Sequence, residues 1–207
     1  MDEKILIISL LALLITLQYR WGRKLNLKLI RGLSSSMEEA FQPVKAEYTW
    51  IGGYVGVVAD YKLKTDNYTG AKLTISLLPR HSLFYLPVSL LTGKRDRVQI
   101  LIKARSKIPY SSIHFKTGRW IKPPEGISEL KRGSRGINGE VVHYWYKNKE
   151  TLVKFMELFE SLKRPGGIKH LTVNQAENAI YADLKITDNT AVEFTKVFLN
   201  HRHSVSN

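Results

Sequence analysis

An uncharged apolar stretch near the N-terminus constrains the fold of this chain more than any other feature. Residues 5–19 read ILIISLLALLITLQY, and Ser9, Thr16 and Gln18 are the polar residues among them. As a helix with a rise of about 1.5 Å per residue, the stretch is roughly 22 Å long, whereas a bilayer core is about 30 Å thick. Interfacial anchoring and local thinning of the bilayer accommodate this difference. The stretch therefore predicts a single transmembrane helix.

The flanks of this stretch favour a membrane anchor over two alternatives. Basic residues follow the apolar run, whereas a cleaved signal peptide has its positive charge before the run and small residues after it. The second alternative is a buried helix of a soluble domain, because apolar runs this short also occur in cores. We expect the anchor to include Ile5, Leu10, Leu14, Leu17, Tyr19 and Trp21, and its basic flank to include Arg20, Arg23, Lys24, Lys28 and Arg31.

The basic flank also predicts the orientation of the chain. Lys and Arg residues next to a membrane span are retained on the cytoplasmic side. We therefore expect the N-terminus outside and the rest of the chain in the cytosol, at the endoplasmic-reticulum membrane of a eukaryote or the plasma membrane of a prokaryote. The chain divides into an anchor with its basic flank, residues 1–24, and one cytosolic domain, residues 25–207. The absence of cysteine from the sequence excludes disulfides and thiolate metal sites, and it fits a cytosolic location.

The pattern after the anchor predicts an α+β domain with a mixed or antiparallel sheet and packed helices. Leu25, Leu29, Leu33, Met37 and Phe41 lie on one face of a helix, which we expect to pack on the sheet; a membrane-surface helix is the alternative. Residues 46–63 predict two strands that meet near Gly52-Gly53. Further strands are predicted within residues 72–78, 98–104, 108–120, 141–146, 168–173 and 179–186, helices at 152–162 and 190–201, and a loop at 122–138.

The chain is strongly basic, which predicts an anionic partner. Its 32 Lys and Arg against 18 Asp and Glu give a net charge of +14. Such a field attracts RNA or anionic lipid headgroups. Long cationic side chains in loops suit contacts to phosphate, although a basic face that only meets solvent is the alternative. The predicted contacts to ribosomal RNA or other phosphates are Arg80, Lys94, Arg95, Arg97, Lys131, Arg132 and Arg135; Lys116 and Arg119 with Trp120 form a further basic and aromatic cluster.

No motif in the sequence indicates catalysis. The histidines form no H-E-x-x-H pattern, and there is no G-x-x-x-x-G-K-[ST] phosphate loop. Ser134 lies in G-S-R-G rather than in a G-x-S-x-G elbow. His114 and His143 fall in predicted strands, where structural roles are expected, and His201-Arg202-His203 is expected to be a solvated tail. We therefore expect no metal, no cofactor, no small-molecule substrate and no enzymatic activity, with an uncharacterised enzyme as the least favoured alternative.

Residues 70–104, GAKLTISLLPRHSLFYLPVSLLTGKRDRVQILIKA, resemble the calumin family. The likeness lies in the strand around residues 73–77, the basic break at Arg80, the short helical segment after it and the sequence DRVQI at 96–100. The order of the later strand and helix, residues 141–162, also fits that family. Calumin is the larger, coiled-coil subunit of an intramembrane chaperone complex that works beside the protein translocon of the endoplasmic reticulum. Compared with it, this chain resembles a minimal version, without the acidic lumenal domain and the C-terminal Lys/Glu-rich coiled coil.

The resemblance implies a non-enzymatic role in the insertion of membrane proteins. It implies three partners besides membrane lipid, namely the ribosome, through its RNA, the translocon, and a small membrane partner subunit. The alternative that the residues leave open is a peripheral scaffold that binds anionic lipid headgroups through the same charges.

Overall fold

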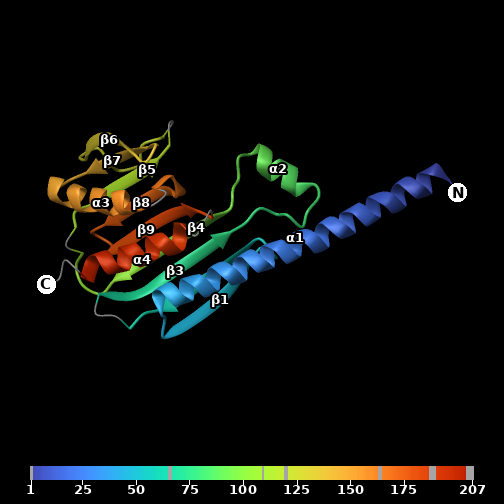
Figure 1. Ribbon diagram of the computed structural model, residues 1–207, viewed down its shortest axis with the longest axis horizontal. Coiled ribbons are helices and arrows are strands. Elements are labelled where there is room, and N and C mark those ends of the chain that lie inside the picture. Colours follow the sequence, from blue (N-terminus) through green and yellow to red (C-terminus); the bar gives the residue numbers. More distant parts are fainter. Residues whose placement is uncertain are drawn as a thin grey trace.

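The computed structural model describes residues 2–64, 67–108, 110–118, 121–162, 165–186 and 190–203. These residues form a nine-stranded sheet in the order β1-β2-β3-β4-β9-β8-β5-β7-β6, in which every pair of neighbours is antiparallel. Three helices, α1, α4 and α3, lie side by side on one face of this sheet (Figure 1). The predicted α+β class is confirmed, and the sheet is antiparallel. The sheet face opposite these helices is called the helix-free face below.

The elements follow one another in this order along the chain: α1 (Glu3–Phe41), β1 (Lys45–Ile51), β2 (Gly56–Lys62), β3 (Tyr68–Ser76), α2 (Tyr85–Leu91), β4 (Arg97–Ala104), β5 (Ile113–Thr117), β6 (Lys131–Ile137), β7 (Glu140–Tyr146), α3 (Lys149–Ser161), the short 3₁₀ turn Pro165–Gly167, β8 (Ile168–Asn174), β9 (Ala179–Lys185) and α4 (Thr190–His203).

The predicted anchor and the predicted amphipathic helix are one continuous helix, α1, which passes residues 24 and 25 without a break. Its first half projects away from the sheet and its second half packs beside α4 (Figure 1). This first half contains the one stretch, within the described residues, that is long and apolar enough to cross a membrane. Only 6% of that stretch is buried, which argues against the alternative of a core helix.

The packed face of α1 is centred one position away from the predicted stripe. Met37 and Phe41 are buried as expected, whereas Leu29 and Leu33 only pack against the edge of the core. Asn26, Ile30 and Ser34 hold the centre of the face instead. The helix ends at Phe41 because Gln42 adopts a left-handed conformation and Pro43 follows.

Strand β6 corrects the prediction of a loop over residues 122–138. Lys131–Ile137 pair with β7 along their whole length and form one edge of the sheet. Only Ile137 is buried in this strand, so its sequence lacks the alternation of apolar and polar residues that marks a half-buried strand. Backbone pairing with β7, rather than side-chain burial, keeps these residues in the sheet.

The core lies between the sheet and the helices and follows strand alternation. In β4, for example, Val98, Ile100 and Ile102 are buried toward the helices, while Gln99 and Leu101 are half-exposed on the helix-free face. Phe115 of β5 contacts Phe155 and Phe159 of α3, and the three rings form an aromatic cluster between the sheet and this helix. The helix-free face therefore leaves polar and aromatic side chains accessible.

Candidate nucleic-acid interface

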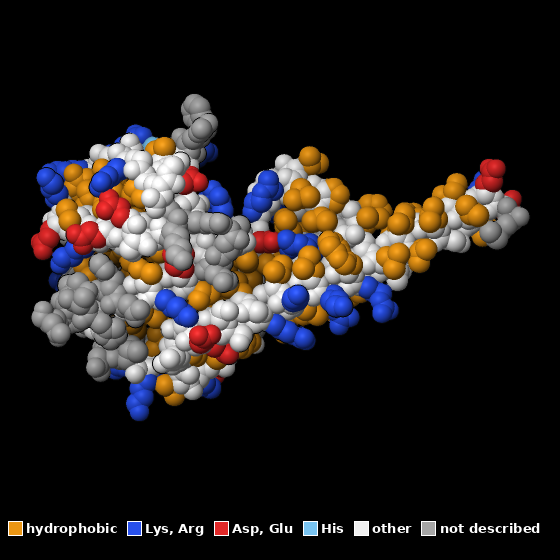
Figure 2. All heavy atoms as spheres, in the orientation of Figure 1, with side chains coloured by type: hydrophobic (Ala, Val, Ile, Leu, Met, Phe, Trp, Pro, Cys, Tyr) orange, Lys and Arg blue, Asp and Glu red, His pale blue; other side chains and the backbone are white. Residues whose placement is uncertain are grey.

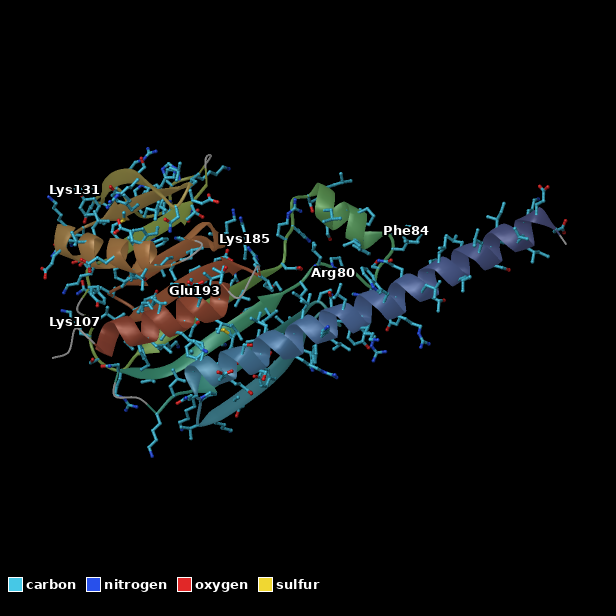
Figure 3. The ribbon with its side chains drawn as sticks, viewed as in Figure 1. Arg80, Phe84, Lys107, Lys131, Lys185 and Glu193 are labelled. Atoms are coloured by element: carbon cyan, nitrogen blue, oxygen red, sulfur yellow. The ribbon has the colours of Figure 1, made fainter. Side chains whose placement is uncertain are left out.

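The predicted phosphate contacts lie in three separate places in the structure. Lys94, Arg95 and Arg97 lie in the turn after α2 and at the start of β4. Lys131, Arg132 and Arg135 lie on β6, at the far edge of the sheet, where Figure 3 labels Lys131. Arg80 belongs to neither group, since it lies in the segment that packs against α1.

Arg80 is a structural residue in this arrangement. Its guanidinium forms a bidentate ion pair with Asp96, with 3.0 Å from Nη1 to Oδ1, and Nη1 also donates to Asn26 Oδ1 at 3.1 Å. Asp96 Oδ1 accepts a second hydrogen bond from the Leu78 backbone amide at 2.7 Å. Because only 17% of the Arg80 side chain is exposed, we remove this residue from the proposed phosphate contacts.

The residues of β6 point to different faces of the sheet. Arg132 pairs with Trp145, which in turn pairs with His114 of β5, so Arg132 shares the helix-free face. Arg135 pairs with the buried Val142, and its Nη1 lies 2.9 Å from Glu160 Oε1 on α3. A surface that binds one anionic partner can therefore include Arg132 but not Arg135.

A basic groove lies on the helix-free face where β4, β8 and β9 meet the turn after α2. Its hollow of about 690 Å³ also borders the β1–β2 turn and the end of β3, where the lining is largely apolar, and we define the groove by the five cations that line it: Lys94, Arg95, Arg97, Lys169 and Lys185. Arg97 Nη1 lies 3.6 Å from Asp183 Oδ2, a carboxylate of the same groove. The cations outnumber this carboxylate and Asp96, which already pairs with Arg80, so the groove favours anions.

Crowding in the basic groove perturbs its titrating groups. Burial, followed by repulsion from Lys185, lowers the pKa of Lys169. Burial also raises the pKa of Asp183, against the opposing effect of Arg97 and Lys169. The groove therefore holds like charges close together, and an incoming anion would relieve their repulsion.

The basic groove continues into an aromatic patch on the same face, made by His114, His170 and Tyr181. The rings of His114 and His170 stack with their centroids 5.9 Å apart, and Tyr181 meets His170 edge-on at 5.9 Å. Thr172 links the two histidines, with 3.1 Å from its Oγ1 to His114 Nδ1 and 2.7 Å to His170 Nε2. In the register of β8 and β9, His170 lies opposite Asp183 and Thr172 opposite Tyr181, so the patch and the groove are contiguous.

The histidines of the aromatic patch are neutral at physiological pH. Burial lowers the pKa of His170 from its ordinary 6.5 to about 4, with further contributions from Lys116 and His114. Burial and Lys116 also lower the pKa of His114. The rings line a hollow of about 540 Å³ that Lys116 and residues 122–125 border. Neutral rings beside lysines suit stacking with nucleobases next to phosphate contacts.

Sequence reasoning missed several members of this surface. It assigned His114 a structural role, and it did not single out Lys169, His170, Tyr181 or Lys185. For His170, Tyr181 and Lys185 the available signal was their place in alternating strands, at positions that face away from the buried residues, whereas Lys169 lies at an irregularity of β8 between Ile168 and His170. Arg119 and Trp120 of the predicted basic and aromatic cluster lie outside the described residues, as do the side chains of residues 201–203. Within the described part of the chain, no group of three or more His, Asp or Glu residues is arranged to hold a metal ion.

No protein-family model matches this chain, and no curated protein sequence matches it significantly.

Proposed function

We propose that this chain is a membrane-anchored, non-enzymatic factor in membrane-protein biogenesis, and that its helix-free face binds ribosomal RNA from the cytosolic side. The first half of α1 would be the anchor, with the basic residues after it in the cytosol. The translocon, a small membrane subunit and membrane lipid would be its other partners, as the calumin-like segment at residues 70–104 implies.

The observation that carries the RNA proposal is the continuity of the basic groove with the aromatic patch. A lipid surface needs exposed cations only, whereas single-stranded RNA uses cations for its backbone and flat rings for its bases. His170 follows Lys169 directly in β8, and Tyr181 lies on the same face of β9 as Lys185, with Asp183 between them. Arg97, Lys116 and Arg132 extend the positive surface along the same face.

Flotation of ribosomes with proteoliposomes tests this proposal. The full chain is reconstituted into neutral phosphatidylcholine vesicles, so that anionic lipid cannot contribute, and vesicles with ribosomes are floated through a density gradient. We expect ribosomes to float with the vesicles only when the protein is present. The variant Lys169→Gln/Lys185→Gln should reduce the floated fraction several-fold.

The matched control is Arg31→Gln/Lys149→Gln, which removes the same charge from exposed positions on α1 and α3. We expect this variant to behave like the unmodified chain. An equal reduction in both variants would mean that total charge, and not the helix-free face, determines binding. Absence of flotation by the unmodified chain at low salt would overturn the ribosome proposal and leave the anionic-lipid scaffold as the better account.

A further inference from the structure

Helix α2 has its apolar side chains outward and a polar one inward. Ser89 is its one buried residue, whereas Tyr85, Val88, Leu90 and Leu91 are exposed, Leu91 to 88%. Phe84, directly before the helix, is 67% exposed. Figure 2 shows hydrophobic side chains gathered over this segment and along the neighbouring half of α1. A contiguous exposed apolar surface of this kind marks a site of contact with a membrane or with another protein.

The position of α2 along α1 is fixed by specific contacts. Gln18 Nε2 donates to the Arg80 carbonyl at 2.7 Å, and Asn26 Nδ2 donates to the Leu78 carbonyl at 2.9 Å. Gly22, between them on the helix, faces the backbone of Arg80 and His81 so closely that a Cβ would lie 2.1 Å from the Arg80 carbonyl oxygen. The segment before α2 is therefore held against the end of the apolar stretch of α1.

Apolar surface is continuous from α1 to α2. A groove of about 660 Å³ is lined by Ile15 and Tyr19 of α1, by Val55 of the β1–β2 turn, and by Leu83 and Phe84. The exposed face of α2 thus begins at the depth where the anchor would leave the hydrocarbon core. Lys94 and Arg95, both exposed, follow the helix within a few residues.

We propose that α2 is an interfacial membrane helix, whose exposed side chains insert into the boundary between headgroups and acyl chains of the bilayer that α1 spans. This inference rests on the proposed membrane anchoring. Its occupant is lipid, because the apolar face is continuous with the anchor and carries Tyr85 and Phe84 at its start and cations at its end, as interfacial helices do. A helix of this length cannot span the bilayer.

Insertion of α2 would fix the domain relative to the membrane. A single spanning helix leaves the domain free to rotate about the helix axis, whereas a second contact beside it sets the rotation and the tilt. The basic groove begins at the turn after α2, so Lys94 and Arg95 would face lipid headgroups while Lys169 and Lys185 remain available to RNA.

Site-specific fluorescence quenching tests this inference. Because the chain has no native cysteine, a single introduced cysteine can be labelled specifically. Single cysteines are introduced as Leu91→Cys in α2, Leu11→Cys in the apolar stretch of α1, and Val153→Cys, an exposed aliphatic position on α3. Each is labelled with an environment-sensitive fluorophore in the full chain, in vesicles of phosphatidylcholine and phosphatidylglycerol. Quenching by doxyl-labelled lipids and by aqueous iodide is then measured.

We expect the label at position 91 to be quenched by shallow doxyl lipids and to have a several-fold lower iodide quenching constant than the label at 153. The label at position 11 should respond to deep doxyl lipids. If the label at position 11 is buried in lipid but the label at position 91 is quenched by iodide as strongly as the label at 153, the inference about α2 is wrong and the proposed anchor stands. If the label at position 11 is also exposed to water, the proposed anchor and the inference about α2 are both wrong. Protection of 91 from iodide without lipid quenching would mean that a protein, such as a second copy of the chain, covers α2, which contradicts insertion into lipid.

Discussion

At the scale of single residues, two glycines of α1 allow the effect of close packing on stability to be distinguished from the effect of helix propensity. Gly22 has the Arg80 backbone against it, whereas nothing lies within 4 Å of a Cβ built at Gly32. Both positions are helical, so Ala is compatible with the backbone at each. The two glycines therefore differ in the space around them and not in conformation.

Gly22→Ala should destabilise the fold, and Gly32→Ala should stabilise it. Overpacking against a backbone that cannot move aside costs about 2 kcal/mol. At the open position, the gain in helix propensity is up to about 1 kcal/mol. Thermal unfolding of the full chain in detergent, followed by tryptophan fluorescence, measures both shifts. Equal shifts for the two variants would mean that α1 does not touch the segment around Arg80.

His170 should make the stability of the domain depend on pH. Its folded pKa of about 4 lies below the ordinary 6.5, so the unfolded chain binds a proton first as the pH falls. The fold therefore loses stability from about pH 6.5 down to about pH 4, and His114 acts in the same direction, whereas Asp183 with its raised pKa opposes them. His170→Gln should flatten this dependence when urea unfolding is measured at several pH values. Parallel profiles of variant and unmodified chain would contradict the assignment.

At the scale of elements, the ion pair between Arg80 and Asp96 connects α1, the segment before α2 and the start of β4. Arg80 contacts Asn26 of α1, and Asp96 accepts from Leu78. Removal of either partner leaves a mostly buried charge without its counterion, which costs about 3 kcal/mol. This polar network thus holds the segment that leads into α2, a helix whose own apolar side chains are mostly exposed.

A double-mutant cycle on this ion pair should show strong coupling. Arg80→Ala and Asp96→Ala should each destabilise the domain, and the double variant should be more stable than the sum predicts by about 1–3 kcal/mol. Chemical unfolding of the full chain provides the free energies. Additive effects would mean that the two side chains act independently.

The elements also show what the sequence could predict and what it could not. The β1–β2 hairpin was predictable because Gly52 and Gly53 supply the positive φ angles, 62° and 69°, of its turn. Strand β6 was not, because an edge strand with exposed side chains has no hydrophobic alternation. Nothing in the sequence indicated that Arg80 forms a structural ion pair, because its partner Asp96 lies in a separate loop. The residues of the helix-free face required the register of β8 against β9, which depends on tertiary pairing.

At the scale of the whole molecule, the surfaces proposed for membrane contact and for RNA binding lie at different places along the long axis. The apolar half of α1 and the exposed face of α2 lie at one end, and β6 with Lys131 lies at the other (Figure 1, Figure 3). The basic groove and the aromatic patch lie between them on the helix-free face. A protein fixed to a membrane at the first end would present this face beside the bilayer, where, under the proposed function, a docked ribosome would meet it.

The most direct test of this account is the salt dependence of ribosome binding by the full chain in neutral vesicles. If the helix-free face contacts phosphates, the logarithm of the binding constant should fall steeply and linearly with the logarithm of salt concentration, because counterions are released. Lys169→Gln/Lys185→Gln should make that slope shallower by about 1.5, since each lysine that neutralises a phosphate contributes roughly 0.7–0.9 to it. Arg31→Gln/Lys149→Gln should leave it unchanged. A slope near zero, or the same slope in all three proteins, would contradict phosphate binding by this face.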